Sequence, residues 1–106
     1  MTLQGFTINL SPNIDLKTLV KHISKQVGQN FPVSNFNRQE LAGGVFYRAV
    51  VNGAVIAAYN HPTKNHSVTT VGPIGTNNAS ASAGIWAVVY TSGFSPDLIK
   101  VYYRVY

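Results

Sequence analysis

The chain has 106 residues, with eight lysines and arginines, three aspartates and glutamates, and no cysteine, for a formal net charge of +5. This length predicts one domain with a modest core, and the lack of cysteine excludes disulfides and thiolate metal sites. The positive balance favours an anionic partner. The basic residues form no arginine-rich run, which argues against nucleic acid as that partner.

No transmembrane segment is expected. No apolar run approaches the ~18 residues that a membrane-spanning helix requires. The first ten residues show neither the basic start nor the apolar stretch of a secretory signal. Three origins stay open: a mature secreted form, a cytoplasmic form, and a protein exported by another route.

Residues 1–42 predict a strand followed by an amphipathic helix. Phe6, Ile8 and Leu10 alternate with polar residues, which is the period of a half-buried strand. Either Ser11 or Asn13 can cap the helix that follows, and a glycine at position 28 can end it. Apolar residues at steps of three and four form one helical face, which consists of Leu16, Leu19, Val20, Ile23 and Val27.

A second face of this helix carries Lys17, Lys21 and Lys25 at steps of four. A cationic amphipathic helix can lie on a membrane, but this apolar side has no Trp or Phe. We therefore expect the apolar side to pack on a sheet, with the lysines in water. Residues 31–41 have no sustained period and are predicted to be a connector.

Residues 43–106 predict short antiparallel strands. β-branched and aromatic residues dominate, and turn signals recur at short intervals, as in a sandwich or barrel. Asn52-Gly53 predicts a hairpin between residues 45–51 and 54–59. Further strands are expected at residues 67–71, 84–91 and 99–106, with a turn at residues 75–78. In the last strand Tyr103 should share one face with Val101 and Val105, and the opposite face should hold Tyr102, Arg104 and Tyr106.

The expected fold class is therefore mainly β: a small antiparallel β-sandwich with an N-terminal strand and an amphipathic helix. We expect one compact domain overall, in which residues 1–42 form an extension and residues 43–106 form the sandwich.

The polar segment YNHPTKNHSVTTV at residues 59–71 is the main candidate site. With Arg48, the side chains of His61, Lys64 and His66 can form a small cationic patch that suits a pyrophosphate or another anionic group. The alternative is that they are ordinary polar residues of a turn. A metal site would need further donors, and with no cysteine and three carboxylates none is expected.

Catalysis is not expected, and neither is a cofactor. A triad of Ser67, His66 and Asp97 can be written on paper, but adjacent residues of a strand point to opposite faces. No nucleophile elbow, phosphate-binding loop or paired-carboxylate spacing occurs. For Trp86, a core position and a ligand-stacking position are both open.

Four elements in one order resemble the lactococcin 972 family of bacteriocins, over roughly residues 43–106. They are the entry at residues 44–46, the histidine segment at residues 59–71, the AGIWA segment at residues 83–87 and the YYRVY ending at residues 102–106. This chain departs from the family pattern in residues 1–42, in Phe46 where Trp is usual, and in Pro62.

The resemblance implies a secreted antibacterial β-sandwich that opens no pore and binds the cell-wall precursor lipid II. The positions that match the family are Tyr59, His61, Lys64, His66, Ser67, Trp86, Tyr102 and Tyr103. Two rivals stay open: a structural protein that assembles through its aromatic edge, and a carbohydrate-binding module that uses Trp86 and tyrosines. The oligomeric state, the target organism and the identity of the ligand do not follow from the sequence.

Overall fold

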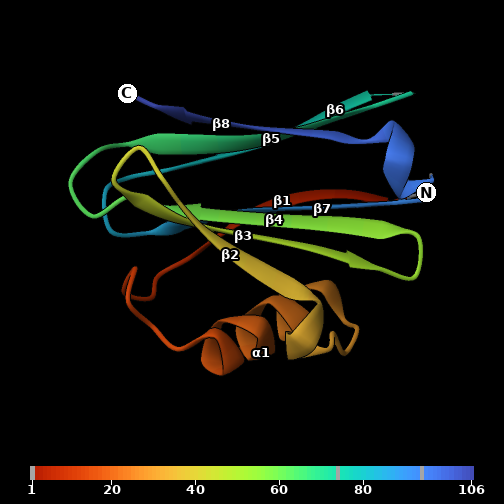
Figure 1. Cartoon of the computed structure of the whole chain (residues 1–106), viewed down its shortest axis with the longest axis horizontal. Coiled ribbons are helices and arrows are strands. Elements are labelled where there is room, and N and C mark those ends of the chain that lie inside the picture. The colour runs from red at the N-terminus through yellow and green to blue at the C-terminus, as the bar shows by residue number, and fades with distance from the viewer. Residues whose placement is uncertain (1, 74, 94) are drawn as a thin grey trace.

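The protein has three layers. The computed structural model describes residues 2–73, 75–93 and 95–106. A five-stranded antiparallel sheet carries the helix α1 on one face and a three-stranded antiparallel sheet on the other (Figure 1). The elements are β1 (Thr2–Ile8), α1 (Leu16–Val27), the short 3-10 helix η1 (Val33–Asn35), β2 (Phe36–Leu41), β3 (Gly44–Val51), β4 (Ala54–Asn60), β5 (His66–Gly72), β6 (Gly75–Ala81), β7 (Trp86–Ser92), the 3-10 helix η2 (Pro96–Leu98) and β8 (Lys100–Val105).

The strand order is β1-β7-β4-β3-β2 in the larger sheet and β6-β5-β8 in the smaller one. The chain passes from the larger sheet to the smaller one between β4 and β5. It returns to the larger sheet at β7 and ends in the smaller sheet with β8. The predicted mainly β fold, with two antiparallel sheets, an N-terminal strand and one helix, is confirmed.

Residues 1–42 contribute directly to the larger sheet. β1 pairs with β7 from Thr2 opposite Ser92 to Ile8 opposite Trp86. β2 pairs with β3 along its whole length, from Phe36 to Leu41. Both edge strands of the five-stranded sheet therefore come from the N-terminal part of the chain.

The Asn52-Gly53 hairpin forms as predicted. Both residues have positive φ, 46° and 76°, and the pairing closes directly at Val51 opposite Ala54. A tight turn of this kind needs the left-handed region at both central positions, which Asn and Gly tolerate best. This turn sets the register of β3 against β4.

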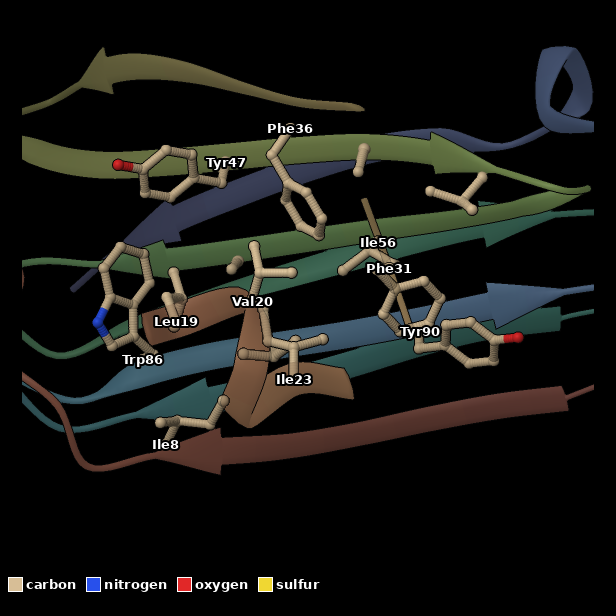
Figure 2. Close-up of a cluster of buried hydrophobic side chains, with 14 of the residues drawn as sticks. Ile8, Leu19, Val20, Ile23, Phe31, Phe36, Tyr47, Ile56, Trp86 and Tyr90 are labelled. Carbon is tan, nitrogen blue, oxygen red and sulfur yellow. The ribbon is translucent and has the colours of Figure 1, made fainter. Parts of the chain in front are cut away.

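The first core lies between α1 and the larger sheet. The helix is capped by Asp15 and not by Ser11 or Asn13, because the Asp15 side chain accepts a hydrogen bond from the Thr18 amide at 3.1 Å. Gly28 ends the helix with φ 87°, as predicted. Leu19, Val20 and Ile23 are buried, as the apolar spacing predicts. In Figure 2 they point at the sheet, where the core continues through Ile8, Phe31, Phe36, Tyr47, Ile56, Trp86 and Tyr90.

A second core fills the space between the two sheets. It contains the buried residues Phe46, Ala57, Tyr59, Val68, Ala79, Ala87 and Val89. Because the larger sheet is covered on both faces, every residue of its central strand β4 is buried. This double coverage explains why the sequence of β4, AVIAAYN, lacks the alternation of a half-exposed strand.

Two segments differ from the sequence prediction. Residues 31–41 are not simply a connector, because they include η1 and the edge strand β2, whose middle residues are polar and exposed. Residues 75–78 are not a turn, because they belong to β6. In β6 the buried Asn77 bonds to the carbonyl oxygens of Gln4 at 2.8 Å and Tyr90 at 3.2 Å. Hydrogen bonds therefore hold this part of β6 in place. A strand held by apolar contacts would instead show alternating apolar residues in its sequence.

Candidate functional site

The residues predicted for a site fall into buried and exposed groups. Tyr59, His66 and Trp86 are each 0% exposed, and His61 and Ser67 are also buried. Arg48, Lys64, Tyr102 and Tyr103 are exposed. A ligand on the surface can therefore contact the exposed residues directly. The buried residues can affect its binding only through the backbone and side chains that they position.

Trp86 is a core residue of the interface between α1 and the sheet. Its ring packs against Tyr47 at a centroid distance of 5.8 Å, and its indole N–H donates to the carbonyl oxygen of Ser11 at 3.1 Å. The burial and the satisfied donor leave no face for ligand stacking. Of the two positions left open by the sequence, the structure places Trp86 in the core.

His61 organises the loop at residues 61–66, which we call the histidine loop. Its Nδ1 accepts hydrogen bonds from the amides of Thr63 at 3.2 Å and Lys64 at 3.1 Å. Nε2 therefore carries the proton and donates to the carbonyl oxygen of Ala42 at 3.0 Å. Both ring nitrogens are occupied by backbone groups, so His61 shapes the loop and has no free nitrogen for a ligand.

His66 secures the other end of the histidine loop. Nδ1 lies 2.9 Å from the carbonyl oxygen of Lys64, and Nε2 lies 2.7 Å from that of Ile85. A neutral imidazole has one N–H for these two acceptors, whereas the imidazolium has one for each. The ring also meets Tyr59 edge-on at a centroid distance of 5.4 Å. His66 thus ties the loop to the segment before β7.

The two histidines hold the backbone of Lys64 from both sides. His61 accepts from its amide, and His66 faces its carbonyl oxygen. The Lys64 side chain is exposed. The loop therefore presents one lysine to solvent from a backbone fixed by two buried rings.

His66 and Ser67 face opposite sides of the smaller sheet. His66 points to the interior at Tyr59, whereas the hydroxyl of Ser67 lies 3.2 Å from that of Tyr106. Ser67 therefore cannot exchange a proton with the neighbouring imidazole. Within the described ranges, no group of three His, Cys, Asp or Glu side chains is placed to hold a metal ion.

Tyr59 links the interior to the surface. Its hydroxyl donates to the carbonyl oxygen of Leu41 at 2.6 Å, and its ring contacts Tyr103 at a centroid distance of 5.3 Å. Burial, with a smaller contribution from Tyr103, raises the pKa of this phenol above its ordinary value. Tyr59 is therefore a neutral hydrogen-bond donor that positions Leu41 and supports Tyr103.

A groove of about 410 Å³ lies between β8 and the β2–β3 edge of the larger sheet, and we call it the sheet-edge groove. It brings together three predicted residues, Arg48, Tyr102 and Tyr103. The other lining residues are Asn37, Gln39, Leu41, Phe46 and Val101. The groove therefore combines one guanidinium, phenol rings and two carboxamides over an apolar floor.

The predicted cationic patch is divided between the groove and the loop. Arg48 lies in the middle of β3, opposite Ala57 of β4, and lines the groove. Lys64 lies in the loop beyond the end of β4 and does not line it. The carboxamides of Asn37 and Gln39 were missed because β2 was predicted to be a connector. Their spacing of two was the available signal, since it places both on one face of a strand.

The chain matches no protein-family model, and comparisons with curated proteins and with solved structures found no match. The described residues contain no helix that is long and apolar enough to span a membrane.

Proposed function

We propose that the protein is a non-enzymatic, bacteriocin-like binder of an anionic cell-envelope precursor of the lipid II type. The observation that carries the proposal is the sheet-edge groove, which is lined by Arg48 together with Tyr102 and Tyr103. The net charge of +5 and the four sequence elements that resemble the lactococcin 972 family support the same ligand class. On this proposal the protein is secreted and acts at the outer face of the target membrane without forming a pore.

The chemistry of the groove suits a phosphorylated sugar. A guanidinium can hold two oxygens of a pyrophosphate with two parallel hydrogen bonds. Tyrosine rings combine apolar area with a polar tip, and the carboxamides of Asn37 and Gln39 offer both donors and acceptors to sugar hydroxyls. Lys64 adds a second, more distant positive charge that attracts the ligand.

A binding role also agrees with how the carboxylates are used. Asp15 caps α1, and Glu40 lies 3.3 Å from Arg38 on the exposed edge strand β2. Asp97 belongs to η2 and does not line the groove. The groove therefore offers a ligand recognition groups and no carboxylate for acid–base chemistry.

Titration calorimetry with purified lipid II in detergent micelles tests this proposal. We expect saturable binding, weakened about tenfold in Arg48→Gln through loss of the charged double hydrogen bond. Arg104→Gln is the matched control, because Arg104 stacks over the Tyr106 ring at 5.2 Å and does not line the groove. Its affinity should equal that of the unmodified protein.

Three outcomes contradict the proposal. The first is no heat of binding at high micromolar lipid II, and the second is equal affinity in Arg48→Gln. The third is equal binding of a polyprenyl phosphate that carries no sugar, since Tyr102 and the carboxamides would then contribute nothing to recognition.

A second candidate function, self-assembly through an aromatic edge, is favoured by β8. Among the residues that the structure describes, β8 pairs with β5 on one side only, and Tyr102, Tyr103 and Tyr106 are 52%, 42% and 61% exposed. Unpaired edge strands can add a further strand. Sedimentation of the chain over a range of concentrations separates the two functions: a monomer throughout favours the binder, and a Tyr102-dependent oligomer favours assembly.

A further inference from the structure

A second groove, which we call the helix groove, is lined by residues of α1 and of the segment that follows it. This helix lies on the opposite side of the molecule from β8 (Figure 1). The volume of the groove is about 590 Å³, and it runs between α1 and the segment that leads from Gly28 to η1. None of its lining residues lines the sheet-edge groove. Its size is within the ~300–1,000 Å³ range of small-ligand sites.

One wall of the helix groove is uniformly basic. Lys17, Lys21 and Lys25 all line it, and all three are exposed. Of the three carboxylates in the chain, Asp15 is near Lys17 but is engaged with Thr18. The others lie elsewhere, on β2 beside an arginine and in η2. Lys21 and Lys25 thus form a cationic pair with no carboxylate among the lining residues.

The rest of the helix groove combines the apolar residues Val20, Phe31 and Val33 with the polar residues Ser24, Gln29 and Asn30. Val20 and Phe31 are buried beneath it, and Val33 is 38% exposed. The apolar face of α1 itself is occupied, because Leu19 and Ile23 are each 0% exposed against the sheet. These residues of the helix are therefore not free to enter a bilayer, and among the apolar side chains that line the groove Val33 is the exposed one.

We propose that the helix groove binds a single dissolved anionic amphiphile, that is, a molecule with one phosphate or carboxylate head and one short apolar tail. The lysine row neutralises the head. The tail lies over Val33, which is 38% exposed, and this contact removes apolar surface from water. A positive wall beside an apolar floor selects against molecules that have only one of these two parts. The site goes beyond the proposed function, since a different face carries it.

The test is a titration of the full chain with octyl phosphate below its micelle concentration, followed by two-dimensional amide NMR. We expect saturable shifts confined to α1 and residues 29–33. The double variant Lys21→Gln, Lys25→Gln should weaken binding roughly tenfold or more. Lys100→Gln, which changes an exposed lysine of β8, is the matched control and should bind normally.

Two further probes separate the charged and apolar parts. Inorganic phosphate and octanol should each bind far more weakly than octyl phosphate. Val33→Ser changes a partly exposed residue, so the fold should persist, and it should weaken binding of octyl phosphate but not of phosphate.

The proposal is overturned if phosphate or octanol binds as tightly as octyl phosphate, or if Lys21→Gln, Lys25→Gln binds normally. It is also overturned if the shifts fall on Arg48 and Tyr102, or if anionic vesicles bind the chain while the monomeric amphiphile does not. Lipid II binding is measured on the same double variant and should be unchanged, because neither lysine lines the sheet-edge groove. The two proposals can therefore fail independently.

Discussion

The histidine loop and the sheet-edge groove use their polar side chains in different ways. In the loop, the rings of His61 and His66 are buried and their nitrogens bond to backbone groups. In the groove, Arg48 and Tyr102 are both exposed, and they come from separate sheets. The more conspicuous sequence motif thus builds the scaffold, and the groups free to bind come from positions that are distant in the chain.

This difference predicts a clear separation in mutational effects. Changes to the buried rings should lower the free energy of unfolding, because each ring fills a core or satisfies backbone atoms. Changes to the groove should lower ligand affinity and leave stability almost unchanged.

The largest effect is expected for Trp86→Ala. Removing a ring that is 0% exposed should lower the free energy of unfolding by about 3–5 kcal/mol. Tyr102→Ala, at a 52% exposed position, should change it by less than about 0.5 kcal/mol. Chemical denaturation measures both. Similar small losses in the two variants would show that Trp86 is not a core residue.

A smaller loss of stability is expected for His66→Leu. This change roughly keeps the side-chain volume but removes the two ring nitrogens that face the carbonyl oxygens of Lys64 and Ile85. We expect a loss of about 1–3 kcal/mol, which is the cost of leaving one such acceptor without its hydrogen bond. His22→Leu is the control, since His22 is exposed on α1. Equal stability of the two variants would contradict the role of His66 as a backbone clamp.

Tyr59→Phe should cost less, about 1–2 kcal/mol, through loss of the hydrogen bond to Leu41. The folded state raises the pKa of this phenol, so it holds the proton more tightly than the unfolded chain does. Its contribution is complete below the ordinary pKa of 10.0 and is lost as the pH rises through the folded-state value. The stability gap between the unmodified protein and Tyr59→Phe should therefore narrow above pH 10. A gap that widens would contradict this sign.

Local signals in the sequence predicted much of the fold. The Asn52-Gly53 turn and the end of the helix at Gly28 could be predicted because these residues readily adopt the positive φ that each position requires. β2 and β6 were missed because neither shows apolar alternation. β2 is an exposed edge, and in β6 the buried position of Asn77 is satisfied by hydrogen bonds to β1 and β7.

The candidate site was less accessible to prediction. The sequence identified Arg48, Tyr102 and Tyr103 separately, but only the pairing of β8 with β5 and the packing of the two sheets place them in one groove. The sequence also indicated His66 as a polar residue of a turn. The carbonyl oxygen of Ile85 that faces its ring comes from a distant segment, so burial of the ring could not be read from its neighbours.

The smallest effect is expected for Lys64→Ala, and it tests the comparison most directly. Lys64 is exposed and lies outside the sheet-edge groove, so it should act on an anionic ligand through a screened, longer-range attraction. We expect lipid II affinity to fall about two- to threefold, against about tenfold for Arg48→Gln, and this smaller loss should vanish at ~1 M salt, where the Debye length is ~3 Å. Calorimetry at low and high salt measures both variants. If Lys64→Ala loses more affinity than Arg48→Gln, the histidine loop contacts the ligand directly. The two histidines would then hold a binding lysine in place, and the assignment of the groove as the primary site would be wrong.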